Sequence, residues 1–178
     1  EVIGADGQAV WGTALWLELN EDLVHALQSQ LTIASGELRR LGHVQQARFD
    51  DGQLSLTLPS EQHYFLWIES PGHHPVHYFL EGSALPDRIS LKACPPFEVE
   101  LLDQDDGGVM AASIVISREG ADAEYSSLGW RDRLVRRYFQ QSSSPNSHGL
   151  AVFDIVPESR LFVWVKPRGP FGVLTRDQ

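Results

Sequence analysis

The segment at residues 49–72 is repeated at residues 147–169, and this repeat constrains the fold more than any other feature. The glycines and tryptophans of the two copies recur at a constant spacing of 97 residues: Gly52 with Gly149, Trp67 with Trp164, and Gly72 with Gly169. A second matched pair, residues 2–19 and 99–116, extends the duplication to the start of each copy. We therefore expect two tandem units, residues 1–93 and 94–178, with a short, stiff boundary at Cys94-Pro95-Pro96.

Alternating apolar and polar residues predict short strands in each unit. Leu54, Leu56 and Leu58 alternate with polar residues, and the apolar run at residues 64–68 predicts the next strand. Residues 2–19 are typical of a strand, an Asp-Gly turn and a second strand. Residues 73–80 indicate a further strand, which Pro75 places at a sheet edge. The expected fold class is mainly all-β, with two tandem antiparallel β-sandwiches.

The first unit carries an insert at residues 20–48. Asn20 is a good N-cap and is followed by Glu21 and Asp22, which favour a helix N-terminus. Leucines recurring every four residues then predict an amphipathic helix from about Glu21 to Gln30. Residues 37–48 are expected to return as a strand or an irregular arm.

The second unit carries an insert at residues 117–147. Trp130, Leu134 and Tyr138 lie four residues apart, which fits a short helix, but an aromatic strand fits equally well. The polar tract at residues 140–147 predicts a loop.

Charge and composition exclude several classes of protein. The net charge of −10 opposes binding to nucleic acid; residues 1–93 contribute −7 (12 acidic, 5 basic) and residues 94–178 contribute −3 (12 acidic, 9 basic). No apolar run approaches the length of a membrane span. Cys94 is the only cysteine, so the chain can form neither an internal disulfide nor a thiolate metal cluster. We interpret Cys94 as an inert, partly buried thiol.

Short motifs in the same order in both units resemble the carboxypeptidase regulatory-like repeat. In the first unit they are DGQAVWGTA at residues 6–14, DGQLSL at 51–56, LP at 58–59 and ESPG at 69–72; in the second they are DDGGV at 105–109, GLAVF at 149–153, VP at 156–157 and KPRG at 166–169. The resemblance implies a transthyretin-like (prealbumin-like) β-sandwich and a non-catalytic module of secreted or cell-envelope proteins. It supplies no catalytic residues, and the two inserts depart from it.

Aromatic residues are the first candidates for ligand binding. Trp67 and Trp164 occupy equivalent apolar strands and are expected to pack in the cores. With Val10, Leu15 and Leu17 pointing inward, Trp16 should point outward, and Trp11 flanks the bend at Gly12. Such rings could stack on sugars, or they could be covered by the insert or by a protein partner.

The second candidate is a basic and aromatic patch in an otherwise acidic chain. It could bind a carboxylate, a sulfated glycan or an acidic protein surface, or it could pair with acids of the same chain. Its members are Trp130, Arg131, Arg133, Arg136, Arg137 and Tyr138.

Histidines after Pro71-Gly72 are the candidate metal ligands. On a strand, His73 and His77 would share one face while His74 points away. A zinc ion would then need a carboxylate such as Glu69 or Glu81, and the alternative is a set of solvated histidines at a sheet edge. No cofactor is expected.

These patterns, with what the resemblance implies, lead us to expect a non-catalytic structural or binding module of a larger bacterial protein, flanked by further domains and located outside the cytoplasm. The chain begins inside a strand-like pattern, which indicates a trimmed or excised segment. The partner would be a protein or, alternatively, a glycan. A carbohydrate-binding module and an accessory domain of a secreted hydrolase or peptidase are the alternative functions. No serine-nucleophile or zinc-protease motif occurs, so we expect no enzyme activity from this chain itself.

Overall fold

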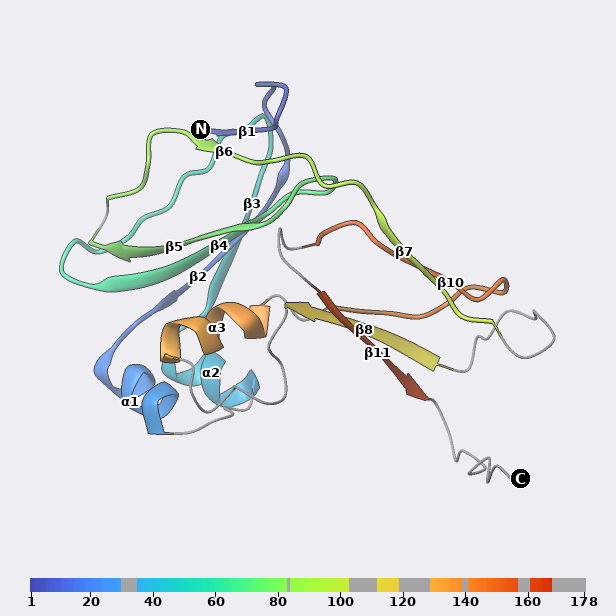
Figure 1. The fold of residues 1–178 in the computed structure, drawn as a ribbon. Coiled ribbons are helices and arrows are strands. Elements are labelled where there is room, and N and C mark those ends of the chain that lie inside the picture. The colour runs from blue at the N-terminus through green and yellow to red at the C-terminus, as the bar shows by residue number, and fades with distance from the viewer. Residues whose placement is uncertain are drawn as a thin grey trace.

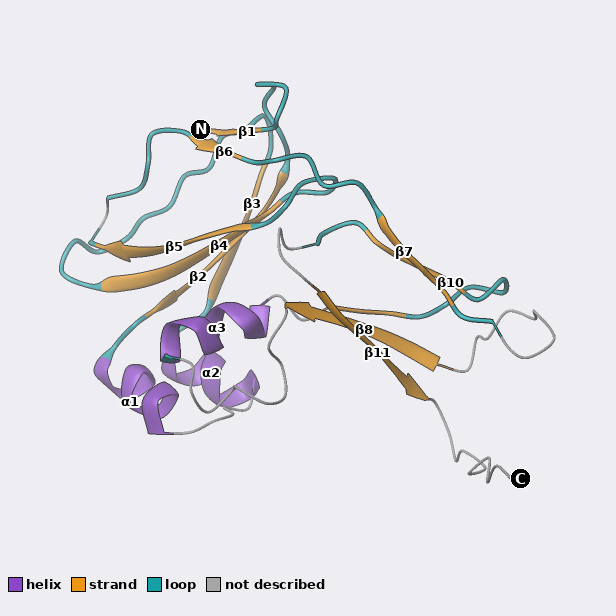
Figure 2. Ribbon diagram, viewed as in Figure 1, coloured by secondary structure: helices purple, strands orange, loops and turns teal. Residues whose placement is uncertain are grey.

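The chain consists mainly of antiparallel β-strands, with three helices gathered on one side of its first half (Figures 1 and 2). The computed structural model describes residues 1–29, 35–82, 84–102, 112–118, 129–138, 141–156 and 161–167, without the side chains of residues 35, 36, 117, 118, 136, 137, 162 and 167. Its elements are β1 (Val2–Ile3), β2 (Gly12–Glu18), α1 (Glu21–Ser29), α2 (Ser35–Leu41), β3 (Gln45–Phe49), β4 (His63–Glu69), β5 (Val76–Glu81), β6 (Ile89–Ser90), β7 (Phe97–Glu100), β8 (Ala112–Arg118), α3 (Trp130–Tyr138), β9 (Gln141–Ser143), β10 (Leu150–Phe153) and β11 (Leu161–Pro167). The prediction of a mainly β protein with antiparallel sheets is confirmed.

Four strands form the main sheet of the first half, in the order β3-β2-β4-β5. β2 pairs with β3 and β4, so that Leu15 lies opposite Trp67 of β4. β5 is the outermost strand and pairs with β4, with His77 opposite Trp67. The predicted edge strand is confirmed, and it begins at Val76, directly after Pro75, because proline cannot donate to a strand ladder.

The turn between β1 and β2 contains Gly7 at φ 78°, as the Asp-Gly motif predicts.

One face of this sheet packs against β1, β6 and the segment at residues 54–58. The N–H of Val2 donates to the carbonyl of Gly52 at 2.7 Å, which holds β1 over the sheet. The buried members of this first core are Val2, Ala14, Trp16, Phe49, Leu58, Tyr64, Leu66, Ile68, Leu80, Ile89 and Leu91.

The opposite face of the sheet is covered by the helices (Figure 1). α1 begins after Asn20, whose side-chain oxygen accepts a hydrogen bond from the N–H of Leu23 at 2.9 Å, so the predicted N-cap and helix are confirmed. The amide nitrogen of Asn20 donates to the carbonyl of Leu41 at 2.6 Å, which ties the end of α2 to the start of α1. The buried members of this second core are Leu17, Leu23, Ala26, Leu27, Leu38, Phe65, Trp67, Leu134 and Val135.

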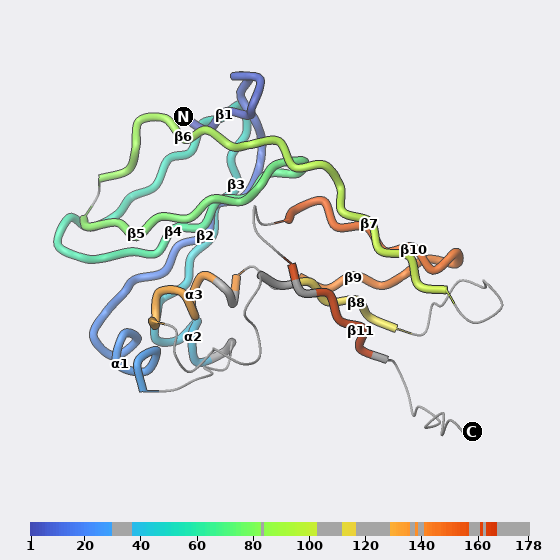
Figure 3. The backbone as a smooth tube through the Cα atoms, viewed as in Figure 1, coloured from blue at the N-terminus to red at the C-terminus, as the bar shows by residue number. Residues whose placement is uncertain are grey.

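The second half contains two small sheets that contribute to a third core. β7 pairs with β10, and β8 lies between β11 and β9 (Figure 3). Apolar residues at alternate positions of β8 and β10 face this core, as the period of two requires. Its buried members are Cys94, Ile114, Ile116, Ala151, Phe153 and Val156.

Contacts across the chain join the two halves. The N–H of Gly72 donates to the carbonyl of Asp154 at 3.3 Å, and the Nδ1 atom of His74 lies 2.5 Å from the carbonyl oxygen of Val156. Leu134 and Val135 of α3, although they come from the second half, are buried against the sheet of the first. The division between residues 93 and 94 remains a prediction about how the chain is organised.

The prediction of a strand at residues 54–58 was wrong. Leu58 is buried and Leu54 and Leu56 pack against the first core, so the alternation of the leucines does describe burial. This segment nevertheless belongs to none of the strands in the described part of the chain. Alternation reports which side chains face a core, and it does not require a paired backbone.

Two further segments differ from prediction. Residues 37–48, expected as a strand or irregular arm, do end in a strand, β3, but they begin inside α2, where Leu38 and Leu41 face the second core three residues apart. A helix of seven residues is too short to show a clear period. Residues 140–147, expected as a loop, contain β9, whose Ser142 lies opposite Val115 of β8. These residues form a strand because they pair with β8, although their intrinsic β-propensity is weak.

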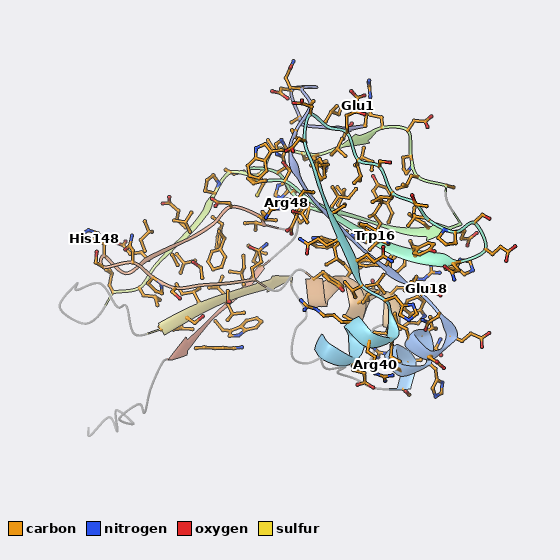
Figure 4. The ribbon with its side chains drawn as sticks, turned by 180° about the vertical axis from the view of Figure 1, so that it is seen from behind. Glu1, Trp16, Glu18, Arg40, Arg48 and His148 are labelled. Carbon is orange, nitrogen blue, oxygen red and sulfur yellow. The ribbon has the colours of Figure 1, made fainter. Side chains whose placement is uncertain are left out.

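The predicted outward orientation of Trp16 was also wrong. Its side chain is only 9% exposed and lies in the first core, inside the first half as seen in Figure 4. The prediction assumed that one face of β2 meets water. In fact the helices cover the face of Leu15 and Leu17, while β1 and β6 cover the face of Trp16.

The two tryptophans at the start of the chain therefore differ in their effect on stability. Trp16→Ala is expected to lower the free energy of unfolding by about 3–5 kcal/mol, because it leaves a cavity in the core. Trp11→Ala should change it by no more than about 0.5 kcal/mol, because Trp11 is 63% exposed. Chemical denaturation of both variants measures this difference, and similar losses in the two would contradict the assignment of Trp16 to the core.

Candidate functional site

Helix α3 carries the predicted basic and aromatic patch and packs it against the first half. Residues 130–138, for which a helix and a strand fitted the sequence equally well, form a helix. Leu134 and Val135 of this helix are buried against the sheet. Asp132 lies in the first turn, where the helix dipole favours an acid. A helix brings Trp130, Leu134 and Tyr138 to one side, and this side faces the second core.

Arg133 connects α3 to the C-terminus of α1. Its side chain is only 8% exposed, and its Nη2 atom donates to the carbonyl of Leu27 and, at 3.5 Å, to that of Gln28. The last carbonyls of a helix lack partners within the helix and carry a partial negative charge, so a guanidinium stabilises them. Within the described residues, the Nε atom of Arg133 is the one buried side-chain nitrogen without a hydrogen-bond partner. Arg133 therefore stabilises the packing of α3 against α1 in the layer formed by α1, α2 and α3.

Arg131, two residues earlier on α3, has a different environment and is exposed. Its guanidinium carbon lies 5.0 Å from the centre of the Phe79 ring and 5.3 Å from that of Trp130. The two rings meet edge to face, with centroids 5.9 Å apart. Because Arg131 is exposed while both rings are half-buried, a planar cation rests on an aromatic surface beside β5. We call Arg131, Trp130 and Phe79 the arginine platform.

The remaining members of the patch are mostly structural or outside the described side chains. Tyr138 lies against Phe65 and Trp67, with ring centroids 5.3 and 6.0 Å apart. The side chains of Arg136 and Arg137 lie outside the described residues. The structure thus brings together Trp130 and Arg131 at the surface and directs Arg133 and Tyr138 inward.

Trp11 and Trp16, both candidates for ligand binding, differ in exposure, at 63% and 9%. Trp11 lies immediately before β2 and is the most exposed of the large apolar side chains in the described part of the chain. Trp16 has no free ring face, because it is buried in the first core. Of these two tryptophans, Trp11 is the one with a ring exposed for stacking.

The predicted metal ligands do not share a strand face. β5 begins only at Val76, so His73 lies before the strand, where its Nδ1 atom is 3.0 Å from the carbonyl oxygen of Pro71. His77 lies on β5 and stacks against Trp67, with ring centroids 6.5 Å apart. Among the described residues, no group of three or more histidine, cysteine or acidic side chains is placed to hold a metal ion.

Cys94 lies in the third core and is buried, as expected for an inert thiol. Burial raises the pKa of its thiol, and a hydrogen bond to the carbonyl of Val156 offsets this only in part. A raised pKa lowers the fraction of thiolate, which is the reactive form.

Sequence reasoning missed the contribution of Phe79. The residue was predicted only as part of an edge strand, and its contact with Arg131 joins positions 52 residues apart. The available signal was the pair of adjacent aromatic residues at 78 and 79 on a strand flanked by proline. This pattern shows that both faces of the edge strand are covered, but it cannot say by which segment.

Comparison of the chain with protein-family models, with curated proteins and with solved structures finds no match. In the described part of the chain, no helix combines the length and the apolar character needed to cross a bilayer.

The two described arginines of α3 offer a matched pair of variants. Arg133→Met is expected to lower the free energy of unfolding by about 1.5–3 kcal/mol, because carbonyls at the end of α1 lose a charged donor. Arg131→Met should change it by less than about 1 kcal/mol, because an exposed cation–π contact contributes little. Thermal and chemical denaturation test the contrast. Equal effects would show that Arg133 does not hold the helical layer.

Two tyrosines should make the fold less stable at alkaline pH. Burial, together with the charge of Glu18, raises the pKa of Tyr64 above 10.0, and burial also raises that of Tyr78. Above this pH the unfolded chain loses protons that the folded chain keeps, so the free energy of unfolding falls as pH rises. Tyr78→Phe should flatten the fall without changing its direction. Denaturation curves from neutral to alkaline pH measure this, and a slope identical to that of the original chain would contradict it.

Proposed function

We propose that this chain is a non-catalytic module that spaces or joins parts of a larger secreted or cell-envelope protein of a bacterium, outside the cytoplasm, and that it binds another protein. The packing of α3 on the sheet of the first half carries this proposal. Arg133 reaches the end of α1, and Leu134 and Val135 fill the second core, so a segment of the second half completes the first. A linker with two independent halves would lack these contacts between its halves.

The duplicated motifs support an architecture of two related units similar to transthyretin-like sandwiches. β2 pairs with β4 and β8 pairs with β11, both antiparallel and both at the repeated positions. The strand pairs can be compared at the two tryptophans: Trp67 lies opposite Leu15, and Trp164 lies opposite Val115. In the first half, moreover, helices take the place of a second sheet on one face.

Hydrogen exchange during denaturation tests whether the chain acts as one unit. We expect the amides of β4 and β8, from the two halves, to lose protection at the same denaturant concentration, because α3 couples them. Arg133→Met should lower that concentration for both strands, while Arg40→Met on α2 serves as an exposed control. Separate transitions for the two strands in the original chain would overturn the proposal of a single rigid spacer.

The alternative function is a carbohydrate-binding module, or an accessory domain of a secreted hydrolase or peptidase. The exposure of Trp11 favours it, since a free aromatic ring can stack on a sugar. Titration of the chain with neutral glycans, followed by tryptophan fluorescence, decides this alternative. It requires a saturable change that Trp11→Ala abolishes and that Leu102→Ala, which removes another exposed apolar side chain, leaves intact.

A further inference from the structure

The guanidinium of Arg131 in the arginine platform has N–H donors that its ring contacts do not use. A guanidinium has five N–H donors, and the ring contacts use only its face. The described part of the chain contains two ion pairs, Glu18 with His43 and Glu1 with Arg88, and Arg131 takes part in neither. Arg133, by contrast, directs its donors to the carbonyls of α1. Arg131 is therefore a fixed, exposed cation whose in-plane donors suit a carboxylate.

The charges around the platform favour a ligand with few, well-placed charges. Asp132 follows Arg131 on α3, and Glu81 lies on the same side of β5 as Phe79, two residues further on; both acids are exposed. With a net charge of −10 on the whole chain, these acids repel a densely charged polyanion such as a sulfated glycan. A single carboxylate placed on Arg131 meets less of this repulsion.

The platform lies beside the open edge of a sheet. β5 is last in the order β3-β2-β4-β5, and β4 is its one strand partner in the described part of the chain (Figures 1 and 2). The outer edge of such a strand offers main-chain donors and acceptors to an added strand. Phe79 belongs both to this edge strand and to the platform, so main-chain pairing and a carboxylate site occur at the same place.

We propose that the partner of this module is an extended segment of another protein, which pairs with the outer edge of β5 and places an aspartate or glutamate side chain on Arg131. The inference rests on the proposed function, since it names the kind of protein that the module binds. The edge strand supplies affinity through the backbone, and the platform selects an acidic residue at one position. The aromatic floor keeps the guanidinium in place, which reduces the entropy lost on binding.

The test uses the full chain and a blocked peptide of about eight residues, mostly threonine with one central glutamate, which is long enough to span β5. Binding is measured by fluorescence anisotropy of the labelled peptide. We expect saturable binding that weakens about tenfold or more in Arg131→Ala, because a charge-assisted contact is lost. Arg131→Lys should weaken it similarly, because lysine keeps the charge but not the planar fork. Arg40→Ala, which removes another exposed arginine in the helical layer (Figure 4), should leave binding unchanged.

A second probe separates strand addition from simple charge attraction. The same peptide with alternate backbone amides N-methylated keeps its carboxylate but loses main-chain donors, and it should bind about tenfold more weakly or worse. Equal binding of the methylated peptide, or unchanged binding in Arg131→Ala, would overturn the proposal. So would tighter binding of heparin than of the peptide, because it would identify a sulfated glycan as the ligand.

The failure of this inference can be told apart from failure of the proposed function. If β4 and β8 lose protection together but no peptide binds, the module remains a single unit and only the partner assigned here is wrong. If the two strands lose protection separately, the spacer proposal fails, whatever the peptide does at β5.

Discussion

The structure depends on the burial of both faces of the sheet of the first half. Side chains of a strand alternate between faces, so a sheet with apolar residues on both must be covered twice. β1, β6 and the segment at residues 54–58 cover the face of Trp16. The other face, with Phe65 and Trp67, is covered by α1 and α2 and also by Leu134 and Val135 of α3, from the second half. The need to cover this face therefore explains why the two halves of the chain are joined.

The same requirement explains why the basic patch divides into two kinds of arginine. A helix that packs on a sheet buries one side and exposes the other. Arg133 lies on the buried side, where a guanidinium is tolerated because the carbonyls at the end of α1 accept its hydrogen bonds. Arg131 lies on the exposed side and rests on Phe79 and Trp130. Residues that look equivalent in the sequence thus serve stability in one case and are free for recognition in the other.

Local sequence signals predicted the elements whose cause is local. The N-cap at Asn20, the turn at Gly7 and the edge strand after Pro75 follow from the chemistry of single residues and were confirmed. The orientation of Trp16 and the platform at Phe79 depend on segments far away in the sequence, which no short pattern can identify. The motif repeat located β4 and β11 correctly, yet it could not show that helices cover one half and strands the other.

An open sheet edge beside a fixed cation also imposes a constraint that the fold must meet. Exposed edges invite pairing between copies of the same chain, and natural proteins limit this with charges and proline. β5 has Pro75 before it and Glu81 at its end, so the paired length is short and one end is negative. In a full-register antiparallel pair of β5 strands, Glu81 of one copy would lie opposite Val76 of the other, at the end away from Phe79 and Arg131. The edge is thus disfavoured for self-pairing, whereas an added strand with an acid opposite Arg131 would gain the one contact that a second β5 lacks.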